Sequence, residues 1–122
     1  MKTGYFDAKE FASKDGKPSP YIMNVQDSLV HLLNKIRGEF GMPIIVNSGY
    51  RSPEHNEAVG GVSNSYHVQG LAADIRPKYI EDLPELQALC DKMNPHGGVG
   101  FYDTFCHVDT RGSRARWDNR TK

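Results

Sequence analysis

One long stripe of apolar residues constrains the fold of this chain more than any other feature. Apolar side chains recur at steps of three and four residues from Ile22 to Phe40, which is the spacing of one face of an amphipathic helix. The members of the stripe are Ile22, Val25, Leu29, Leu32, Leu33, Ile36 and Phe40. We therefore predict one long helix from Pro20 onward, ended by Gly38 or Gly41.

The chain after this helix predicts short strands and two shorter helices. Apolar or β-branched runs indicate strands at residues 44–46, 71–75, 99–102 and 105–109, and helical patterns cover 53–59 and 83–93. Only Asp103 and Thr104 separate the last two strands, which is the length of a tight hairpin turn. Helices followed by strands with few parallel crossovers predict an α+β domain with a mostly antiparallel sheet packed by helices.

Length and charge limit the domain count and the class of partner. A chain of 122 residues has room for one core, so we expect a single domain over residues 1–122 and a monomer. Because 15 basic residues balance 15 acidic ones, the net charge gives no reason to expect nucleic acid as a partner. The C-terminus is locally basic and is either a solvated tail or a contact for anionic polymers. Its members are Arg111, Arg114, Arg116, Arg120 and Lys122.

Targeting segments and cysteines give little information about where the protein acts or how it folds. No apolar run approaches the ~18 to 20 residues that span a bilayer, and the first residues lack the apolar stretch of a secretory signal. If the protein acts outside the cytoplasm, we expect either a signal missing from this sequence or release by another protein. Cys90 and Cys106 are expected to be reduced and buried, with a single bridge as the alternative.

Two segments, residues 65–74 and 105–109, carry the residues suited to chemistry. His67, Asp74 and His107 supply two imidazoles and one carboxylate, a donor set that suits zinc. Three protein ligands leave a fourth position for water, which is typical of catalytic zinc sites. Gly70 permits a sharp chain reversal, so the strand that follows can direct Asp74 back toward His67.

Other polar residues near these segments have two or more interpretations. Asp109 shares a strand face with His107, so it either takes a proton from water at the metal, orients His107, or pairs with Arg111. Ser65 either binds substrate or shapes its loop. Trp117 either covers the sheet edge or offers a ring for sugar contact. The remaining histidines are expected to be surface or capping groups, and these are His31, His55 and His96.

The pattern Ser-x-His-x-x-Gly-x-Ala-x-Asp at residues 65–74, followed by a histidine on a terminal strand, resembles the zinc D-alanyl-D-alanine carboxypeptidase family, the M15 peptidases. These peptidases share a fold with the hedgehog signalling domain. The resemblance covers most of the chain, because residues 48–52, Asn56, 60–61, 97–102 and 105–109 also match in order.

The resemblance implies roles for individual residues. His67, Asp74 and His107 would be zinc ligands, and Arg51 would hold a substrate carboxylate or steady the oxyanion. Many relatives place the catalytic carboxylate three residues before the final histidine ligand, where this chain has Thr104. The candidates for the base are therefore Asp109, which the His-x-Asp subgroup favours, and Asp103 in the preceding turn.

We therefore expect a zinc peptidase that cuts peptidoglycan stem peptides, with Arg51 as a stabiliser and Asp109 as the base. It would trim a terminal D-alanine as a carboxypeptidase or cut within a stem as an endopeptidase, and the small number of insertions favours an open cleft. Small relatives of this kind predict a phage-type lysin released by a partner protein. The alternative is a non-catalytic binding or phage tail module of the same fold, stabilised by zinc.

Overall fold

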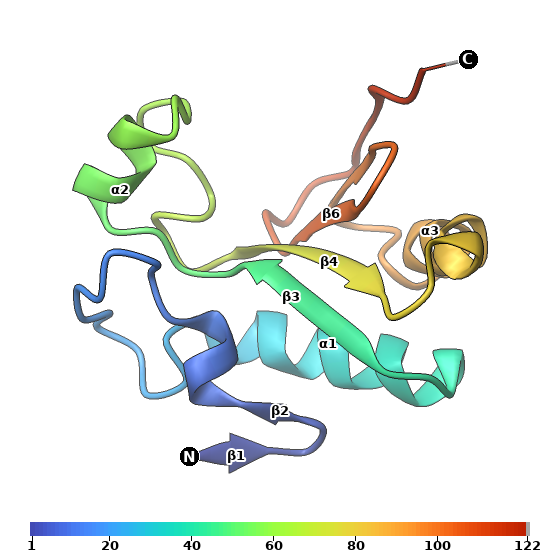
Figure 1. Cartoon of the computed structure of the whole chain (residues 1–122), viewed down its shortest axis with the longest axis horizontal. Coiled ribbons are helices and arrows are strands. Elements are labelled where there is room, and N and C mark those ends of the chain that lie inside the picture. The colour runs from blue at the N-terminus through green and yellow to red at the C-terminus, as the bar shows by residue number, and fades with distance from the viewer. Residues whose placement is uncertain (122) are drawn as a thin grey trace.

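A five-stranded sheet organises the computed structural model, which describes residues 1–121 (Figure 1). Its strand order is β3-β4-β6-β5-β7, and every neighbouring pair is antiparallel except β5 and β7. The strands are β3 (Ile44–Ser48), β4 (Ala72–Pro77), β5 (Gly98–Phe101), β6 (Cys106–Asp109) and β7 (Ala115–Asp118). The α+β class and the mostly antiparallel sheet are confirmed.

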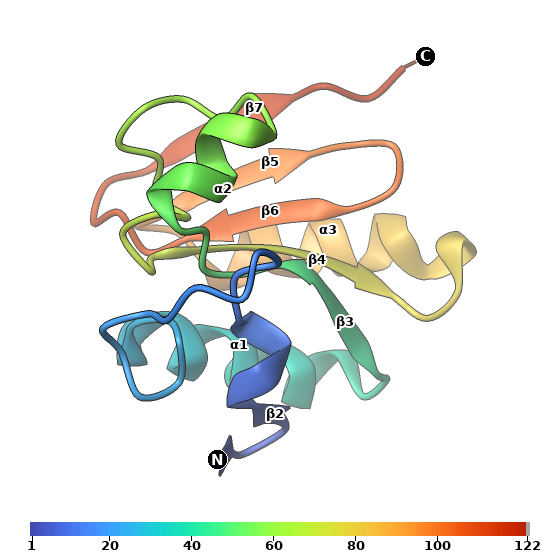
Figure 2. The ribbon, with the colours of Figure 1, turned by 60° about the vertical axis from the view of Figure 1, so that its left-hand side comes forward.

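Two helices lie side by side against one face of the sheet. These are α1 (Asp27–Phe40) and α3 (Leu83–Met93), and a 3₁₀ turn, η2 (Ile80–Asp82), leads into α3 (Figure 2). Leu33 and Ile36 of α1 and Leu86 of α3 are completely buried in the core that they form with the sheet. The short helix α2 (Pro53–Ala58) and the loop after it stand apart from these two, beyond the other end of β3 (Figure 1).

The N-terminal segment packs on the body of the protein through two aromatic rings. A small hairpin of β1 (Lys2–Thr3) and β2 (Phe6–Asp7) leads into the 3₁₀ turn η1 (Ala8–Phe11). Asp7 caps this turn, and Glu10 completes the capping box by accepting the backbone N–H of Asp7 at 2.7 Å. Phe6 and Phe11 are both buried in the core, so the segment packs on the main body.

The long helix begins later than the apolar stripe predicts. Helix α1 starts at Asp27, and Ile22 at the head of the stripe is 79% exposed. Asn24 has a left-handed φ of 67°, which breaks any helix that approaches from Pro20. Val25 is still buried, so the apolar periodicity continues through a segment that is not helical. The helix ends at Phe40, and Gly41 caps it with a φ of 73°.

The strand β7 is absent from the sequence prediction, and it changes the interpretation of the basic C-terminus. Arg116 donates to Asp91 at 2.6 Å and to the carbonyls of Gly97 and Asn94 at 2.8 Å, which ties β7 to the end of α3. Arg120 pairs with Asp118. Arg116 is therefore a structural tie, whereas Arg114 and Arg120 are exposed, and Lys122 lies outside the described residues.

Two remaining expectations concern cysteines and membranes. Cys90 and Cys106 are free and fully buried, as the reduced interpretation predicts. Among residues 1–121, no helix has both the length and the apolar character needed to cross a bilayer.

A substitution at Gly70 tests whether the chain reversal before β4 requires glycine. It has a φ of 71°, and a Cβ at this position would lie 2.7 Å from the ring of Tyr21. Gly60 has a similar φ of 74° but open space around it. We expect Gly60→Ala to lower the free energy of unfolding by about 1 kcal/mol and Gly70→Ala by about 2 to 3 kcal/mol, since only the second adds a clash. Urea denaturation measures the free energy of unfolding of both variants. Equal losses in the two would contradict the predicted clash between a Cβ at position 70 and Tyr21.

Candidate metal centre

A single row of residues crosses the sheet and forms the floor of the candidate metal centre. Strand register places Ser48 opposite Asp74, Asp74 opposite His107, His107 opposite Gly100, and Gly100 opposite Trp117. Directly opposed residues project from the same face of a sheet. The pairing of the strands therefore brings Asp74 and His107 together although 33 positions separate them in the sequence.

The third member of the cluster, His67, comes from the loop before β4. Its Nδ1 lies 2.8 Å from the carbonyl oxygen of Gly49. A carbonyl only accepts, so Nδ1 carries the hydrogen and the lone pair of Nε2 is directed toward Asp74. Ser65 accepts the backbone N–H of His67 at 3.1 Å, so it shapes the loop, one of the two roles considered for it.

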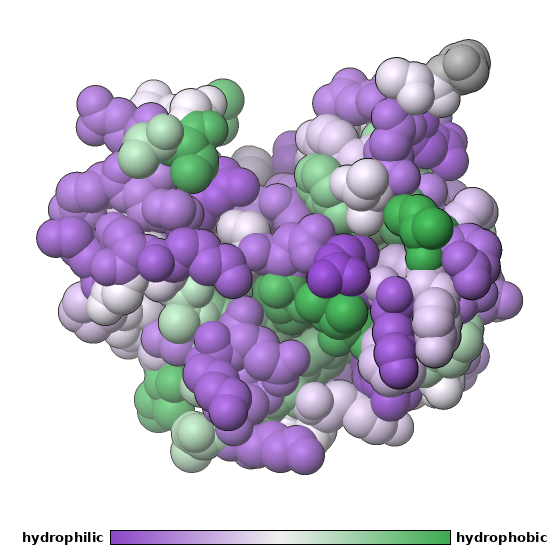
Figure 3. Space-filling model, viewed as in Figure 1, coloured by the Kyte–Doolittle hydropathy of each residue, from purple (hydrophilic) through white to green (hydrophobic). Residues whose placement is uncertain are grey.

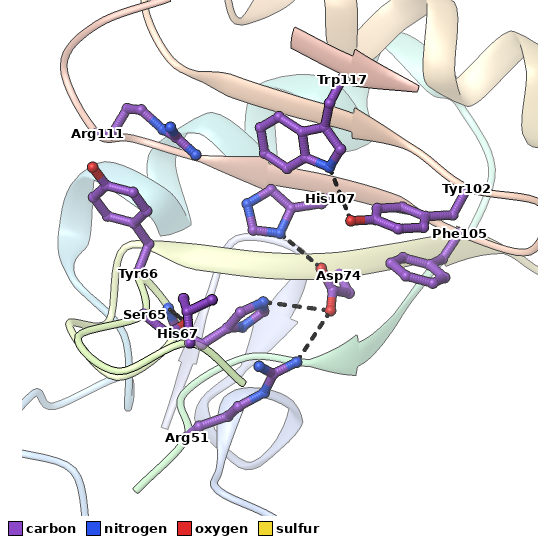
Figure 4. Close-up of a pocket in the computed structure, with 11 residues that line it drawn as sticks. Arg51, Ser65, Tyr66, His67, Asp74, Tyr102, Phe105, His107, Arg111 and Trp117 are labelled. Atoms are coloured by element: carbon purple, nitrogen blue, oxygen red, sulfur yellow. Dashed lines mark hydrogen bonds and ion pairs between the residues drawn. The ribbon is translucent and has the colours of Figure 1, made fainter. Parts of the chain in front are cut away.

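His107 is held in the complementary way, with its other nitrogen facing the cluster. Its Nε2 lies 2.8 Å from Oδ2 of Asp109, and its Nδ1 lies 3.0 Å from Oδ1 of Asp74. Both partners are carboxylates and only accept, so the doubly protonated ring donates to both. When the ring carries one hydrogen, the shorter contact to Asp109 keeps it on Nε2 and leaves the lone pair of Nδ1 for a cation. Both histidines thus have one nitrogen fixed by the protein and one directed at Asp74 (Figure 4).

The donor set fits a small divalent cation. Ligand atoms of His67, Asp74 and His107 all lie within 4.8 Å of one another, and Nε2 of His67 is 3.4 Å from Oδ2 of Asp74. Two neutral imidazoles and one carboxylate suit zinc and related metals. His31 and His96 are exposed and His55 is half-buried on α2, and none of the three belongs to the cluster.

Electrostatics show how strongly these groups interact. Burial alone would raise the pKa of Asp74, but its hydrogen bonds with His107 and His67 hold that pKa well below its usual range. Burial alone would lower the pKa of His107, but Asp109 and Asp74 raise it to about 9. In the metal-free protein, a proton on His107 therefore occupies the place that a bound cation would take.

Arg51 completes the cluster from the loop after β3. Its Nη2 lies 3.6 Å from Oδ2 of Asp74, and its Nε donates to Ser48 at 3.3 Å. Its Nη1 donates to the amide oxygen of Asn56 at 3.3 Å, and Asn56 is buried and bonded in turn to the carbonyl of Val62. The guanidinium is therefore held on three sides, by groups from β3, α2 and β4.

Asp109 lies behind His107 and is completely buried. Arg111 donates to both of its carboxylate oxygens, at 2.9 and 2.8 Å, and Gly98 donates its backbone N–H at 3.0 Å. Burial alone would raise the pKa of Asp109, but Arg111 and His107 hold it well below the usual range. This position fits the orienting and Arg111-pairing roles, and Asp109 is not among the described residues that line the cavity over the cluster.

The other candidate for the base also faces away from the cluster. Both carboxylate oxygens of Asp103 accept from Thr121, each at 2.9 Å, and neither Asp103 nor Thr104 lines the cavity at the metal centre. Among the described residues that line this cavity, Asp74 is the single carboxylate.

A cavity of about 440 Å³ opens over the cluster. Space-filling representation shows the surface hollowed between the lobe that carries α2 and the lobe that carries the C-terminal strand (Figure 3). The walls include residues that the sequence analysis did not assign to the site, namely Val62, Tyr66, Tyr102, Phe105 and Arg111. Trp117 also lines the cavity, with its ring centroid 5.1 Å from that of His107.

Comparison with known proteins agrees with this geometry. The family model described as Peptidase M15 matches residues 4–109, which is most of the chain. This chain belongs to the M15 peptidase family. Within curated proteins, it is similar to the "Probable peptidoglycan L,D-endopeptidase MepK" of Haemophilus influenzae, with 38% identity over 74 residues. The match covers 55% of this chain and 39% of that relative, so the M15 chain described here spans well under half the length of the relative.

The metal centre can be tested by removing one ligand at a time. We expect His67→Ala and His107→Ala each to weaken Zn²⁺ binding by more than about 100-fold, since altering a residue that only supports a ligand already costs about 10- to 100-fold. His31→Ala, on the exposed face of α1, is the matched control and should bind as the wild type does. Isothermal titration calorimetry measures the affinities, and unchanged binding in both ligand variants would rule out this site.

Proposed function

We propose that residues 1–122 act as one zinc-dependent peptidase domain that hydrolyses peptide bonds in peptidoglycan stem peptides. The observation that carries this proposal is the cluster of His67, Asp74 and His107 at the floor of an open cavity, in a member of a peptidase family. The substrate class is supported by the Haemophilus relative, whose name is probable peptidoglycan L,D-endopeptidase.

A zinc ion at this cluster would act as a Lewis acid that polarises the scissile carbonyl and acidifies a water molecule. The protein supplies the geometry. Arg51, whose Nη2 lies 3.6 Å from Asp74, would place a cationic fork beside the reacting carbonyl or a substrate carboxylate. Ser65 holds the His67 loop in shape and would contact substrate only from the cavity wall.

In this proposal Asp109 is a positioning residue and not the base. Its carboxylate fixes the ring of His107 through Nε2, and Arg111 neutralises the carboxylate and shields it from water. A metal-ligating histidine that donates to a carboxylate is both oriented and made more basic. Asp109 thus acts on the substrate only through His107.

An endopeptidase fits the cavity better than a carboxypeptidase. The cavity lies in a hollow between two lobes of the surface, which leaves room for peptide on both sides of a scissile bond (Figure 3). The relative is also named an endopeptidase. The phage-type lysin released by a partner protein, which the sequence suggests, is the biological setting that we include in this proposal.

One observation favours a second candidate function. The described lining of the cavity contains no carboxylate besides Asp74 that could take a proton from water. A peptidoglycan-binding module that keeps the metal for stability would need no such group. The two functions differ in turnover, so one experiment separates them.

The test is a digest of purified muropeptides by the zinc-loaded protein, followed by mass spectrometry. We expect new fragments whose masses identify the bond that is cut. Arg51→Lys should lower kcat/KM by about 10- to 100-fold, because lysine provides a point charge in place of two parallel donors. Intact muropeptides at high protein concentration, with zinc bound, would leave only the binding function.

The role of Asp109 gives a separate prediction. Asp109→Ala removes the partner of His107 and leaves Arg111 without its ion pair, so we expect zinc affinity to fall by about 10- to 100-fold. Asp103→Ala removes an exposed carboxylate and should leave both affinity and turnover unchanged. Calorimetry and the muropeptide digest measure the two quantities. Full zinc affinity with complete loss of turnover in Asp109→Ala would instead indicate that Asp109 is the base.

A further inference from the structure

The side chain of Tyr102 occupies the wall of the cavity across the cluster from Arg51. Tyr102 follows β5, and its ring stacks on Phe105 with centroids 4.3 Å apart and planes 9° apart. This stacking fixes the direction of the ring. Figure 4 shows the hydroxyl pointing into the cavity on one side of Asp74, whereas Arg51 approaches Asp74 from the other side.

A hydrogen bond from Trp117 determines what the Tyr102 hydroxyl can do. Nε1 of Trp117 donates to the hydroxyl oxygen at 2.9 Å. An indole N–H is only a donor, so the hydroxyl must accept here and its own hydrogen must point elsewhere. Within residues 1–121, the hydroxyl donates to no other protein group. The cavity therefore contains a fixed hydroxyl with one hydrogen left for a ligand.

The sheet is built so that Trp117 can make this bond. Gly100 lies opposite both His107 and Trp117 in the row that crosses the strands. The indole fills the space above Gly100, where a Cβ would come within 2.4 Å of the ring. A larger residue at position 100 would therefore push Trp117 away from Tyr102.

We propose that Tyr102 is a catalytic residue that donates a hydrogen bond to the oxygen of the scissile carbonyl. This inference rests on the proposed peptidase function. When the carbonyl carbon becomes tetrahedral, its oxygen gains negative charge, and a donor fixed in advance stabilises that charge without reorganising. No bond to Tyr102 forms or breaks. Trp117 is a positioning residue in this arrangement, because it acts through the Tyr102 hydroxyl.

The first test is the kinetic effect of Tyr102→Phe, which removes the hydroxyl and keeps the stacked ring. We expect kcat on muropeptides to fall about 10- to 100-fold, with KM changed less than about threefold. Thermal stability and zinc content should match those of the wild type. Tyr79→Phe, at an exposed tyrosine outside the cavity lining, is the matched control and should keep full activity. A kcat within twofold of the wild type, or a loss confined to KM, would overturn the inference.

Trp117→Phe separates positioning from general damage. It removes the N–H donor and keeps an aromatic ring, so kcat should fall about 3- to 10-fold in the wild-type background. In the Tyr102→Phe background the same change should have little further effect, because the hydroxyl that Trp117 positions is already gone. Additive losses in the double variant would mean that Trp117 acts independently of Tyr102.

A binding measurement distinguishes this inference from the proposed function. The probe is a phosphinate dipeptide, whose tetrahedral oxyanion replaces the scissile carbonyl, titrated into the zinc-loaded protein by calorimetry. We expect Tyr102→Phe to bind it about 10-fold more weakly than the wild type. Equal affinity would overturn the role of Tyr102 while leaving the peptidase function in place. If the wild type neither cuts muropeptides nor binds the phosphinate, both proposals fail.

Discussion

The in-register pairing of β4 with β6 is the constraint on which the rest of the site depends. This pairing sets Asp74 directly opposite His107, and a shift of one residue would turn one of them to the other face of the sheet. The buried neighbours of these residues fix the register, since Ala73, Ile75 and Val108 face the helices in the core. The metal centre is thus a consequence of how the core packs, and the helices need no direct contact with it.

The groups around the cluster leave each of the two histidines with one nitrogen free to bind a metal. Gly49 takes one nitrogen of His67, and Asp109 takes one nitrogen of His107, so the second nitrogen of each ring has only the cluster to face. Arg111 balances the charge of Asp109, which would otherwise be an unpaired carboxylate in the interior. This arrangement keeps the ligands in place before any ion binds.

Sequence patterns predict those parts of the fold that local composition determines. Apolar or β-branched runs predict the strands that carry Asp74 and His107, and helical spacing predicts the helix at residues 83–93. The structure contains both strands and the helix. Residues 22–26 are predicted wrongly, because Val25 is buried in a turn while the left-handed Asn24 interrupts the helix. Periodicity alone cannot distinguish a buried turn from the first turn of a helix.

Sequence patterns do not predict strand β7 or the residues that form the wall of the cavity. The strand contains arginine, tryptophan and aspartate, which give no apolar alternation, and the long-range bonds of Arg116 stabilise it. Trp117 therefore reaches the metal centre through tertiary packing that its neighbours in the sequence do not encode. The same holds for Asp109, whose shared face with His107 is readable from the sequence but whose complete burial beneath Arg111 is not.

The most direct test of this account is the location of the ion in a crystal of the zinc-loaded protein. Anomalous diffraction at the zinc absorption edge locates the metal without assuming its ligands. We predict one strong peak bonded to Nε2 of His67, a carboxylate oxygen of Asp74 and Nδ1 of His107, at the ~2.0 to 2.2 Å typical of such ligands. A peak at any other group of residues, or none at this cluster with zinc in excess, would contradict the account.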